Sequence, residues 1–176
     1  IFADVLDLKP EQILPFSTGV IGQLLPLAPF QDNAEKLAER LSEESMNQVA
    51  EGILTTDLVD KCHSETFEFD GKTITLTGIA KGSGMIRPDM ATMLSFIVTD
   101  ICASQQQLQA CLAQAVNQSF NRITVDGDTS TNDALTLSAT NQADTKLSDC
   151  LESFQEALNK LTQDLAHKIV RDGEGA

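Results

Sequence analysis

The sequence has 176 residues, of which 12 are basic and 26 acidic, giving a net charge of −14 at pH 7. This excess of negative charge disfavours nucleic acid or an anionic membrane as a partner. A chain of this length can bury a substantial core and is most simply a single domain over residues 1–176. It begins with Ile, and we expect it to be an internal segment of a longer polypeptide.

Cysteine spacing and hydropathy both bear on where the protein works. The four cysteines show neither C-x-x-C nor metal-ligand spacing; they are Cys62, Cys102, Cys111 and Cys150. Reduced thiols in a cytoplasmic protein without a bound metal are the simpler expectation. The uncharged run from residue 13 to residue 30 is interrupted by three prolines and two glycines. It is therefore expected to be buried strand and turn rather than a membrane-spanning helix.

In chain order, the first candidate site is a glycine-flanked turn. Gln12–Phe16 is expected to form a short strand that runs into Ser17-Thr18-Gly19-Val20-Ile21-Gly22. Such a turn can present backbone N–H groups to a developing oxyanion, although an ordinary glycine turn has the same pattern. Apolar residues at helical spacing then predict amphipathic helices over Asp32–Leu41 and Glu44–Leu54. The second helix leads into Thr55-Thr56-Asp57, which by itself is a polar helix end.

The clearest hairpin signal follows. Thr66–Phe69 and Lys72–Thr77 alternate polar and apolar residues around Asp70-Gly71, a pair that favours a tight turn between antiparallel strands. The second strand is expected to run on to Lys81. A lysine at a strand end is usually solvated, but beside a catalytic nucleophile its charge can bind a carboxylate substrate.

The stretch from Lys81 to Leu94 reads KGSGMIRPDMATML. Two glycines follow Lys81, a proline stiffens the middle of the stretch, and Thr92 directly precedes an apolar run over Met93–Val98 that predicts a strand. A hydroxyl at the edge of a sheet, fed by a glycine-hinged loop, can serve as a nucleophile. The alternative is a loop that ends in a capping or strand threonine.

A polar run, Asp126–Asp133, follows a strand expected over Arg122–Val125. Its acidic spacing is similar to a calcium loop, but the sixth position holds Thr131 and the twelfth Leu137, where such a loop needs Gly and Glu. We therefore expect no calcium there. A loop dense in Asp, Thr and Asn can instead order a neighbouring active site through hydrogen bonds.

Two helices are expected in the second half of the chain. Ser104 and Gln107 form a capping box at the start of one. The other carries an apolar stripe from residue 147 to residue 169 and runs out at Asp172-Gly173-Glu174-Gly175, ordinarily a helix end with an exposed acid. Strands and helices that alternate in this way predict an α/β layered sandwich.

The stretch ending in Thr92 resembles the self-cleavage segment of the ornithine acetyltransferases, the glutamate N-acetyltransferases of arginine biosynthesis, and the resemblance covers essentially all 176 residues. That family usually has Asn at the position of Asp89. The resemblance implies that the bond between Ala91 and Thr92 breaks autocatalytically, dividing the chain into 1–91 and 92–176. Thr92 then becomes the catalytic nucleophile, and its freed α-amine, with a reference pKa of roughly 7.7–8.0, takes the proton.

The same resemblance implies further site residues. Thr18 and Gly19 match the oxyanion-holding pair of the family, while Thr55, Lys81, Thr92 and Glu174 match its substrate contacts. The run Asp126–Asp133 resembles another characteristic segment of the family.

The family's fold and assembly are implied as well. It has helices outside two stacked sheets, in an N-terminal-nucleophile-like architecture. Its substrates are N2-acetylornithine and glutamate, without a cofactor; acetyl-CoA as a further donor stays open. A heterotetramer of two alpha and two beta chains is expected. The alternatives are an aminopeptidase or amidohydrolase of similar architecture, in which water takes the acyl group, and an inactive structural segment.

Overall fold

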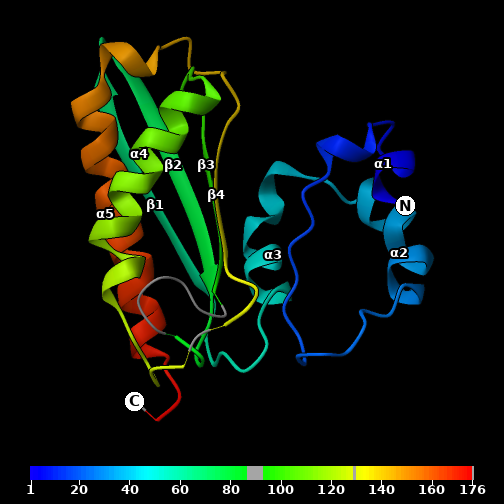
Figure 1. Ribbon diagram of the computed structural model, residues 1–176. Helices are drawn as coiled ribbons and strands as arrows, with labels where there is room; N and C mark the ends of the chain where they lie inside the picture. Colours follow the sequence, from blue (N-terminus) through cyan, green and yellow to red (C-terminus); the bar gives the residue numbers. More distant parts are fainter. Residues whose placement is uncertain (87–92, 129, 176) are drawn as a thin grey trace. The chain divides into compact units, whose positions relative to one another are not determined.

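The computed structural model describes residues 1–86, 93–128 and 130–175, apart from the side chain of residue 43. The chain divides into two compact units, Ile1–Met46 and Asn47–Ala176. Both are shown in Figure 1, and each is described by itself.

The first unit is built from short helices. They are α1 (Phe2–Val5), η1 (Pro10–Gln12), α2 (Ala28–Glu39) and η2 (Glu43–Ser45). The rings of Phe2 and Phe30 meet edge to face, with centroids 6.3 Å apart, and join α1 to α2. The strand expected over Gln12–Phe16 is wrong: residues 13–27 contain neither helix nor strand. An extended segment becomes a strand only when another strand pairs with it, and no described strand does so here.

The second unit contains a four-stranded sheet in the order β1-β2-β3-β4. Its strands are β1 (Lys61–Phe69), β2 (Lys72–Lys81), β3 (Leu94–Thr99) and β4 (Ala134–Ala139). The first two pairings are antiparallel and the third is parallel. The hairpin predicted around Asp70-Gly71 is confirmed, and both turn residues have positive φ, 50° and 73°, as a tight hairpin turn requires.

Two long helices, α4 (Gln105–Gln118) and α5 (Leu151–Arg171), cover one face of this sheet and lie on the same side of the strands (Figure 1). The chain also contains α3 (Met46–Gly52) and the short helices η3 (Phe120–Arg122) and η4 (Leu147–Asp149). The capping box of Ser104 and Gln107 is confirmed. The strand expected over Arg122–Val125 is wrong. Phe120–Arg122 form the short helix η3, and the Val125 N–H donates to the carbonyl of Ile86, which belongs to no strand.

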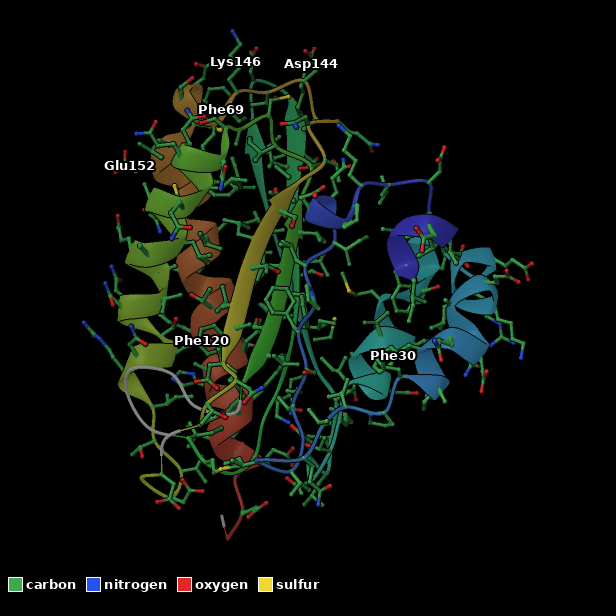
Figure 2. All side chains as sticks on the ribbon, turned by 45° about the vertical axis from the view of Figure 1, so that its right-hand side comes forward. Phe30, Phe69, Phe120, Asp144, Lys146 and Glu152 are labelled. Atoms are coloured by element: carbon green, nitrogen blue, oxygen red, sulfur yellow. The ribbon has the colours of Figure 1, made fainter. Side chains whose placement is uncertain are left out.

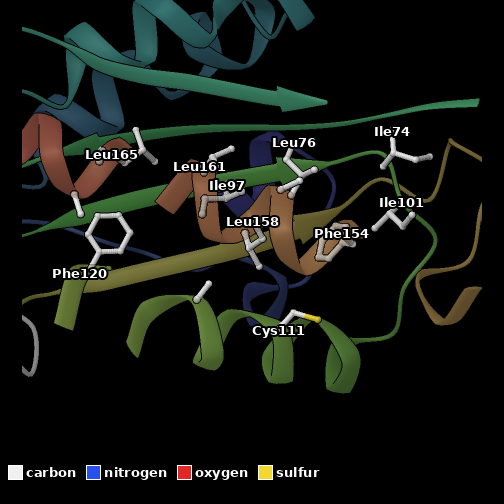
Figure 3. Close-up of a cluster of buried hydrophobic side chains, with 14 of the residues drawn as sticks. Ile74, Leu76, Ile97, Ile101, Cys111, Phe120, Phe154, Leu158, Leu161 and Leu165 are labelled. Carbon is white, nitrogen blue, oxygen red and sulfur yellow. The ribbon is translucent and has the colours of Figure 1, made fainter. Parts of the chain in front are cut away.

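The core lies between the sheet and α5. Gly78 in β2 permits close packing there: a Cβ at that position would lie 2.9 Å from a methyl carbon of Leu161. Figure 2 shows the described side chains, with Phe30 in the first unit and Phe69 and Phe120 in the second. Figure 3 shows the central apolar side chains; those fully buried include Ile74, Leu76, Ile97, Ile101, Phe154, Leu158, Leu161 and Leu165.

The expected α/β class, with helices packed outside a sheet, is confirmed. The described residues form one sheet, so the second sheet of the expected sandwich stays a prediction. In the part of the chain that the structure describes, no helix has the length and apolar character needed to cross a membrane.

Candidate functional site

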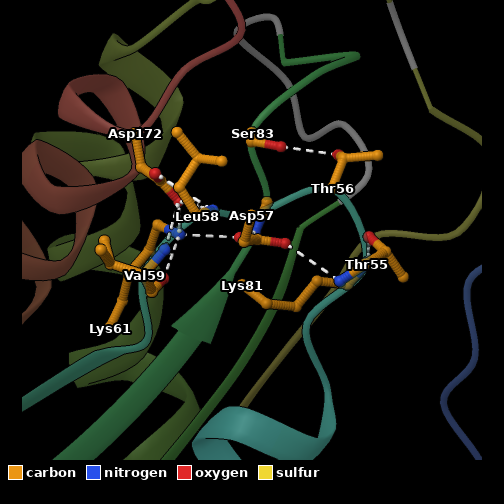
Figure 4. A network of polar contacts seen from close by, with 10 residues as sticks. Thr55, Thr56, Asp57, Leu58, Val59, Lys61, Lys81, Ser83 and Asp172 are labelled. Atoms are coloured by element: carbon orange, nitrogen blue, oxygen red, sulfur yellow. Dashed lines mark hydrogen bonds and ion pairs between the residues drawn. The ribbon is translucent and has the colours of Figure 1, made fainter.

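Lys81, the last residue of β2, marks the candidate site. Its side chain is fully buried, so the solvated strand end considered from the sequence is wrong. The Lys81 Nζ lies 3.5 Å from the Thr55 hydroxyl oxygen (Figure 4). Burial lowers the pKa of Lys81, and the charges of Asp57 and Asp133 offset only part of that shift. The strand therefore delivers a buried amine next to a hydroxyl.

A second buried lysine, Lys61, lies at the start of β1. Its Nζ is 2.7 Å from Asp57 Oδ1, 2.6 Å from Asp172 Oδ2 and 3.1 Å from the Val59 carbonyl oxygen. Three acceptors match the three N–H donors of an ammonium group. Lys61, Asp57 and Asp172, here called the Lys61 cluster, thus form a buried ion network (Figure 4).

Asp57 links this cluster to the segment after β2, Gly82-Ser83-Gly84, here called the glycine loop. Its carboxylate accepts the backbone N–H of Gly82 at 2.6 Å and that of Thr55 at 3.3 Å. Burial acts to raise the pKa of Asp57, but the hydrogen bonds from Lys61, Gly82 and Thr55, with the Lys61 charge, outweigh it and hold the pKa below its usual value. Asp57 therefore stays ionised and fixes the loop that carries Thr55.

Two further contacts attach the same loop. Asp172, just after α5, accepts the backbone N–H groups of Leu58 and Val59. The hydroxyls of Thr56 and Ser83 are 2.7 Å apart. The loop is thus fastened to α5 on one side and to the glycine loop on the other.

Glu174 lies beside the glycine loop. Its backbone N–H donates to the Ser83 carbonyl at 2.8 Å. A Cβ at Gly84 would lie 3.1 Å from the Glu174 carboxyl atoms, so the glycine leaves room for that carboxylate. Three predicted substrate contacts, Thr55, Lys81 and Glu174, therefore come from three elements to the same end of the sheet.

The polar run Asp126–Asp133 contacts the chain on both sides of residues 87–92. Asp126 accepts the backbone N–H groups of Met85 at 2.5 Å and Ile86 at 3.1 Å. These hydrogen bonds and that of Asp128 outweigh slight desolvation and lower the pKa of Asp126. On the other side, Asp133 Oδ1 accepts the Met93 N–H at 2.7 Å. The run thus holds the described chain on both sides of residues 87–92 by hydrogen bonds, and its ordering of an active site stays a prediction.

Asp133 differs from the other carboxylates of the site. Its Oδ2 is buried and has no hydrogen-bond partner among the described residues. Burial raises the pKa of Asp133 to about 6, against the lowering effects of the Met93 hydrogen bond and the Lys81 charge. This carboxyl group thus changes its charge close to neutral pH.

The other four predicted residues are not among the described residues of the second unit. Thr18, half-buried, and Gly19, exposed, belong to the first unit. Ala91 and Thr92 lie outside the described residues. The oxyanion pair, the cleavage site and the division into 1–91 and 92–176 therefore stay predictions.

Sequence reasoning missed Lys61, Asp133 and Asp172 as members of the site. Asp57 and Lys61 are four residues apart, and Asp172 lies 111 residues beyond Lys61. No local pattern indicates a pairing over that distance. Among the described residues, no group of His, Cys, Asp or Glu side chains is arranged to hold a metal ion.

Fold and site together define an α/β protein with a buried, lysine-containing polar site where a glycine loop leaves the sheet. A model of the ArgJ family matches residues 1–176. The chain belongs to the ArgJ family, which confirms the resemblance inferred from the sequence.

Similar proteins support this membership. The chain is 47% identical over 180 residues to the arginine biosynthesis bifunctional protein ArgJ of Desulfotalea psychrophila, covering 100% of this chain and 46% of that protein. It is 45% identical to the protein of the same name from Pseudomonas fluorescens, covering 99% and 44%. The chain thus spans less than half the length of these relatives.

Two solved structures are distantly similar. The PH0078 protein of Pyrococcus horikoshii OT3 gives a TM-score of 0.48 at 12% identity, over 64% of this chain and 39% of that one. The L-aminopeptidase D-Ala-esterase/amidase of Ochrobactrum anthropi gives 0.46 at 14% identity, over 64% and 40%. Similarity at this level assigns no function.

Proposed function

We propose that the chain is part of an acetyltransferase of arginine biosynthesis that moves the acetyl group of N2-acetylornithine to glutamate. The observation that carries the proposal is ArgJ family membership over the whole chain. It is supported by the contact of Lys81 with Thr55 and by the position of Glu174 beside Gly84, three residues after Lys81.

Thr92 is the proposed nucleophile, freed by cleavage after Ala91. Before cleavage its nitrogen belongs to an amide and cannot act as a base; afterwards it is an amine with a reference pKa of roughly 7.7–8.0. The Thr92 hydroxyl then forms an ester with the acetyl group, while the amide bond of N2-acetylornithine breaks and ornithine leaves with the proton. The amine of glutamate attacks the ester and regenerates the hydroxyl. Thr18 and Gly19 are the proposed oxyanion donors.

Lys81 is proposed to bind the α-carboxylate that both substrates carry. Because burial disfavours its charged form, an incoming carboxylate would compensate an otherwise costly cation. Thr55, 3.5 Å from Lys81 Nζ, would hydrogen-bond the same ligand. Glu174 offers a carboxylate for a cationic group of the substrate.

The wider setting follows from the family resemblance. The cut protein is proposed to assemble in the cytoplasm from two alpha chains that end at Ala91 and two beta chains that begin at Thr92. Acetyl-CoA as a second acetyl donor for glutamate belongs to the same proposal. Native mass spectrometry of the full-length protein checks the assembly.

The full-length protein with Thr92→Ala tests the function. We expect one uncut polypeptide with no acetyl transfer, whereas Thr92→Ser, which keeps a hydroxyl, should be cut at least in part and retain activity. The assay is a denaturing gel together with transfer of labelled acetyl to glutamate. Cleavage or acetyl transfer by Thr92→Ala would contradict the proposal, and release of acetate to water alone in wild type would favour a hydrolase.

A further inference from the structure

The Lys61 cluster buries three charged side chains at one end of the sheet. Those of Lys61 and Asp57 are fully buried, and that of Asp172 is 4% exposed. Replacing a buried ion pair by apolar side chains of similar size is often neutral or even stabilising, because the charges have lost their hydration. Stability alone therefore does not explain a buried lysine between two carboxylates at this place in the fold.

The carboxylates of the cluster also accept backbone N–H groups from the candidate site. Asp57 Oδ1 accepts that of Gly82 at 2.6 Å, and Asp57 Oδ2 accepts that of Thr55 at 3.3 Å. Asp172 accepts those of Leu58 and Val59, in the loop that follows Thr55. The cluster thus binds the backbone of two segments that are far apart in the sequence.

Asp57 holds the backbone on both sides of one contact in the site. Gly82 directly follows Lys81, so its nitrogen is two covalent bonds, each about 1.3–1.5 Å, from the Lys81 Cα. Thr55 carries the hydroxyl that lies 3.5 Å from Lys81 Nζ. The Asp57 carboxylate is itself fixed by Lys61, whose Nζ lies 2.7 Å from Oδ1 (Figure 4). A single carboxylate thereby links the two residues that are proposed to bind the substrate carboxylate.

We propose that Asp57 is a positioning residue, which sets the distance between the Thr55 hydroxyl and the Lys81 amine to fit the α-carboxylate of the substrate. This inference rests on the proposed function and adds to it a residue that does not touch the substrate. The Asp57 side chain is fully buried, and both its oxygens are bound to groups of the protein. Asp57 therefore acts on the ligand through Thr55 and Lys81.

The charge of Asp57 acts on the same pair of residues. Burial lowers the pKa of Lys81, and the negative charge of Asp57 is the largest of the effects that oppose this shift, ahead of that of Asp133. The positive charge of Lys61 adds to the lowering. Because a carboxylate binds the protonated form of Lys81, the charge of Asp57 supports the binding that its hydrogen bonds would shape.

Asp57→Asn in the full-length protein tests the inference, because the amide has one acceptor oxygen where the carboxylate uses two. We expect kcat/KM for N2-acetylornithine to fall roughly tenfold, mainly through a higher KM. The rate of 4-nitrophenol release from 4-nitrophenyl acetate, an acetyl donor without a carboxylate, should stay the same. A loss confined to the substrate with a carboxylate is not expected from general damage to the fold.

Asp100→Asn is the matched control. The Asp100 carboxylate also accepts a backbone N–H of β2, that of Thr75 at 3.1 Å, but six residues before Lys81. Its replacement removes the same charge and leaves the candidate site intact. Neither kcat/KM for N2-acetylornithine nor the rate with 4-nitrophenyl acetate should change.

A double-mutant cycle with Lys81→Met shows whether Asp57 acts through that residue. Once Lys81 has lost its amine, its exact position matters less to the ligand. The loss of kcat/KM in the double variant should therefore be smaller than the product of the two single losses.

Each outcome decides. In folded and cut Asp57→Asn, an unchanged KM, an equal loss with 4-nitrophenyl acetate, or losses that multiply in the cycle overturns the inference. If Asp57→Asn does not fold or is not cut, a crystal structure of wild-type protein with bound ornithine decides. The inference requires the ornithine carboxylate on Lys81 and Thr55, with Asp57 still bound to the N–H groups of Thr55 and Gly82; any other arrangement overturns it. Wild-type protein that transfers no acetyl group refutes the proposed function instead.

Discussion

The buried Lys61 cluster and the half-buried Asp133 are two ionic regions at the same end of one sheet, and they differ in how completely their polar groups are paired. In the cluster, Lys61 has three acceptors, and both carboxylates also receive backbone N–H groups. At Asp133, one oxygen accepts the Met93 N–H, and the other has no donor in the part of the chain that the structure describes. The pKa shifts follow: the pKa of Asp57 is lowered, whereas that of Asp133 is raised to about 6.

The difference indicates different tasks. A buried network in which every group is satisfied fixes the chain that supplies its members, here the loop with Thr55, the glycine loop and the end of α5. A carboxylate with a buried oxygen that no described donor satisfies is unfavourable as a purely structural feature. At Asp133 the charge of Lys81 offsets only part of that cost.

The largest expected effect comes from breaking the complete network. Lys61→Met removes the shared cation and leaves Asp57 and Asp172 buried without it, so we expect the free energy of unfolding to fall by about 3–5 kcal/mol. Denaturant unfolding of the second unit measures this. Lys72→Met, which breaks the exposed pair with Asp144, should cost less than about 1 kcal/mol. Equal losses of unfolding free energy in the two variants would show that the buried Lys61 cluster stabilises the fold no more than an exposed ion pair does.

Lys81→Met removes the cation whose charge acts on both Asp57 of the cluster and Asp133. A buried charge that binds a substrate carboxylate contributes about 1.5–3 kcal/mol, so KM should rise roughly ten- to a hundredfold with a smaller change in kcat. Steady-state kinetics with both substrates gives the split. Because Lys81 is close to the cleavage stretch in sequence, a gel must first show normal cutting. Unaltered KM values in a normally cut variant would remove Lys81 from the binding site.

Asp133 should make the stability of the folded protein depend on pH. In the folded, uncut chain the pKa of Asp133 is raised from 3.8 to about 6, so the folded state binds more protons than the unfolded state between these values. Stability is therefore lost as pH rises through this range. In an uncut Thr92→Ala background, Asp133→Asn should remove the loss.

The midpoint temperatures of the two uncut proteins, measured from pH 4 to pH 8, check this expectation. Their difference should grow in favour of Asp133→Asn up to about pH 6 and stay constant above it. A difference that does not vary with pH would mean that Asp133 is already compensated in the uncut chain.

The smallest effect is expected at the edge of the complete network. Thr56→Val removes the hydroxyl that lies 2.7 Å from that of Ser83, and a hydrogen bond of this kind contributes about 0.5–1.5 kcal/mol. A double-mutant cycle with Ser83→Ala isolates the pair. If the two losses simply add, the contact does not help to fasten the loop.

Features set by short-range patterns could be predicted from the sequence. The Asp70-Gly71 hairpin and the Ser104 capping box depend on neighbouring residues and were placed correctly. The position of Lys81 followed, because a strand that starts at a fixed turn has a predictable far end. Glu174 was placed by family resemblance, and its meeting with the glycine loop required the tertiary structure.

Features set by long-range pairing could not be predicted. β4 was missed because its six residues become a strand through parallel pairing with β3, across the α4 connection. The strand expected over Arg122–Val125 failed for the converse reason, since those residues find no strand to pair with. Likewise, the sequence around Asp172 indicates a helix end, and only the fold brings it to Lys61.

The most direct test of the central claim is the mass of the full-length protein before and after brief mixing with N2-acetylornithine. Cleavage followed by covalent catalysis predicts two fragments, the second beginning at Thr92, with an acetyl group appearing on the Thr92 side chain and disappearing when glutamate is added. An uncut polypeptide, a fragment beginning elsewhere, or an acetyl group that never forms on Thr92 while acetyl transfer proceeds would contradict it.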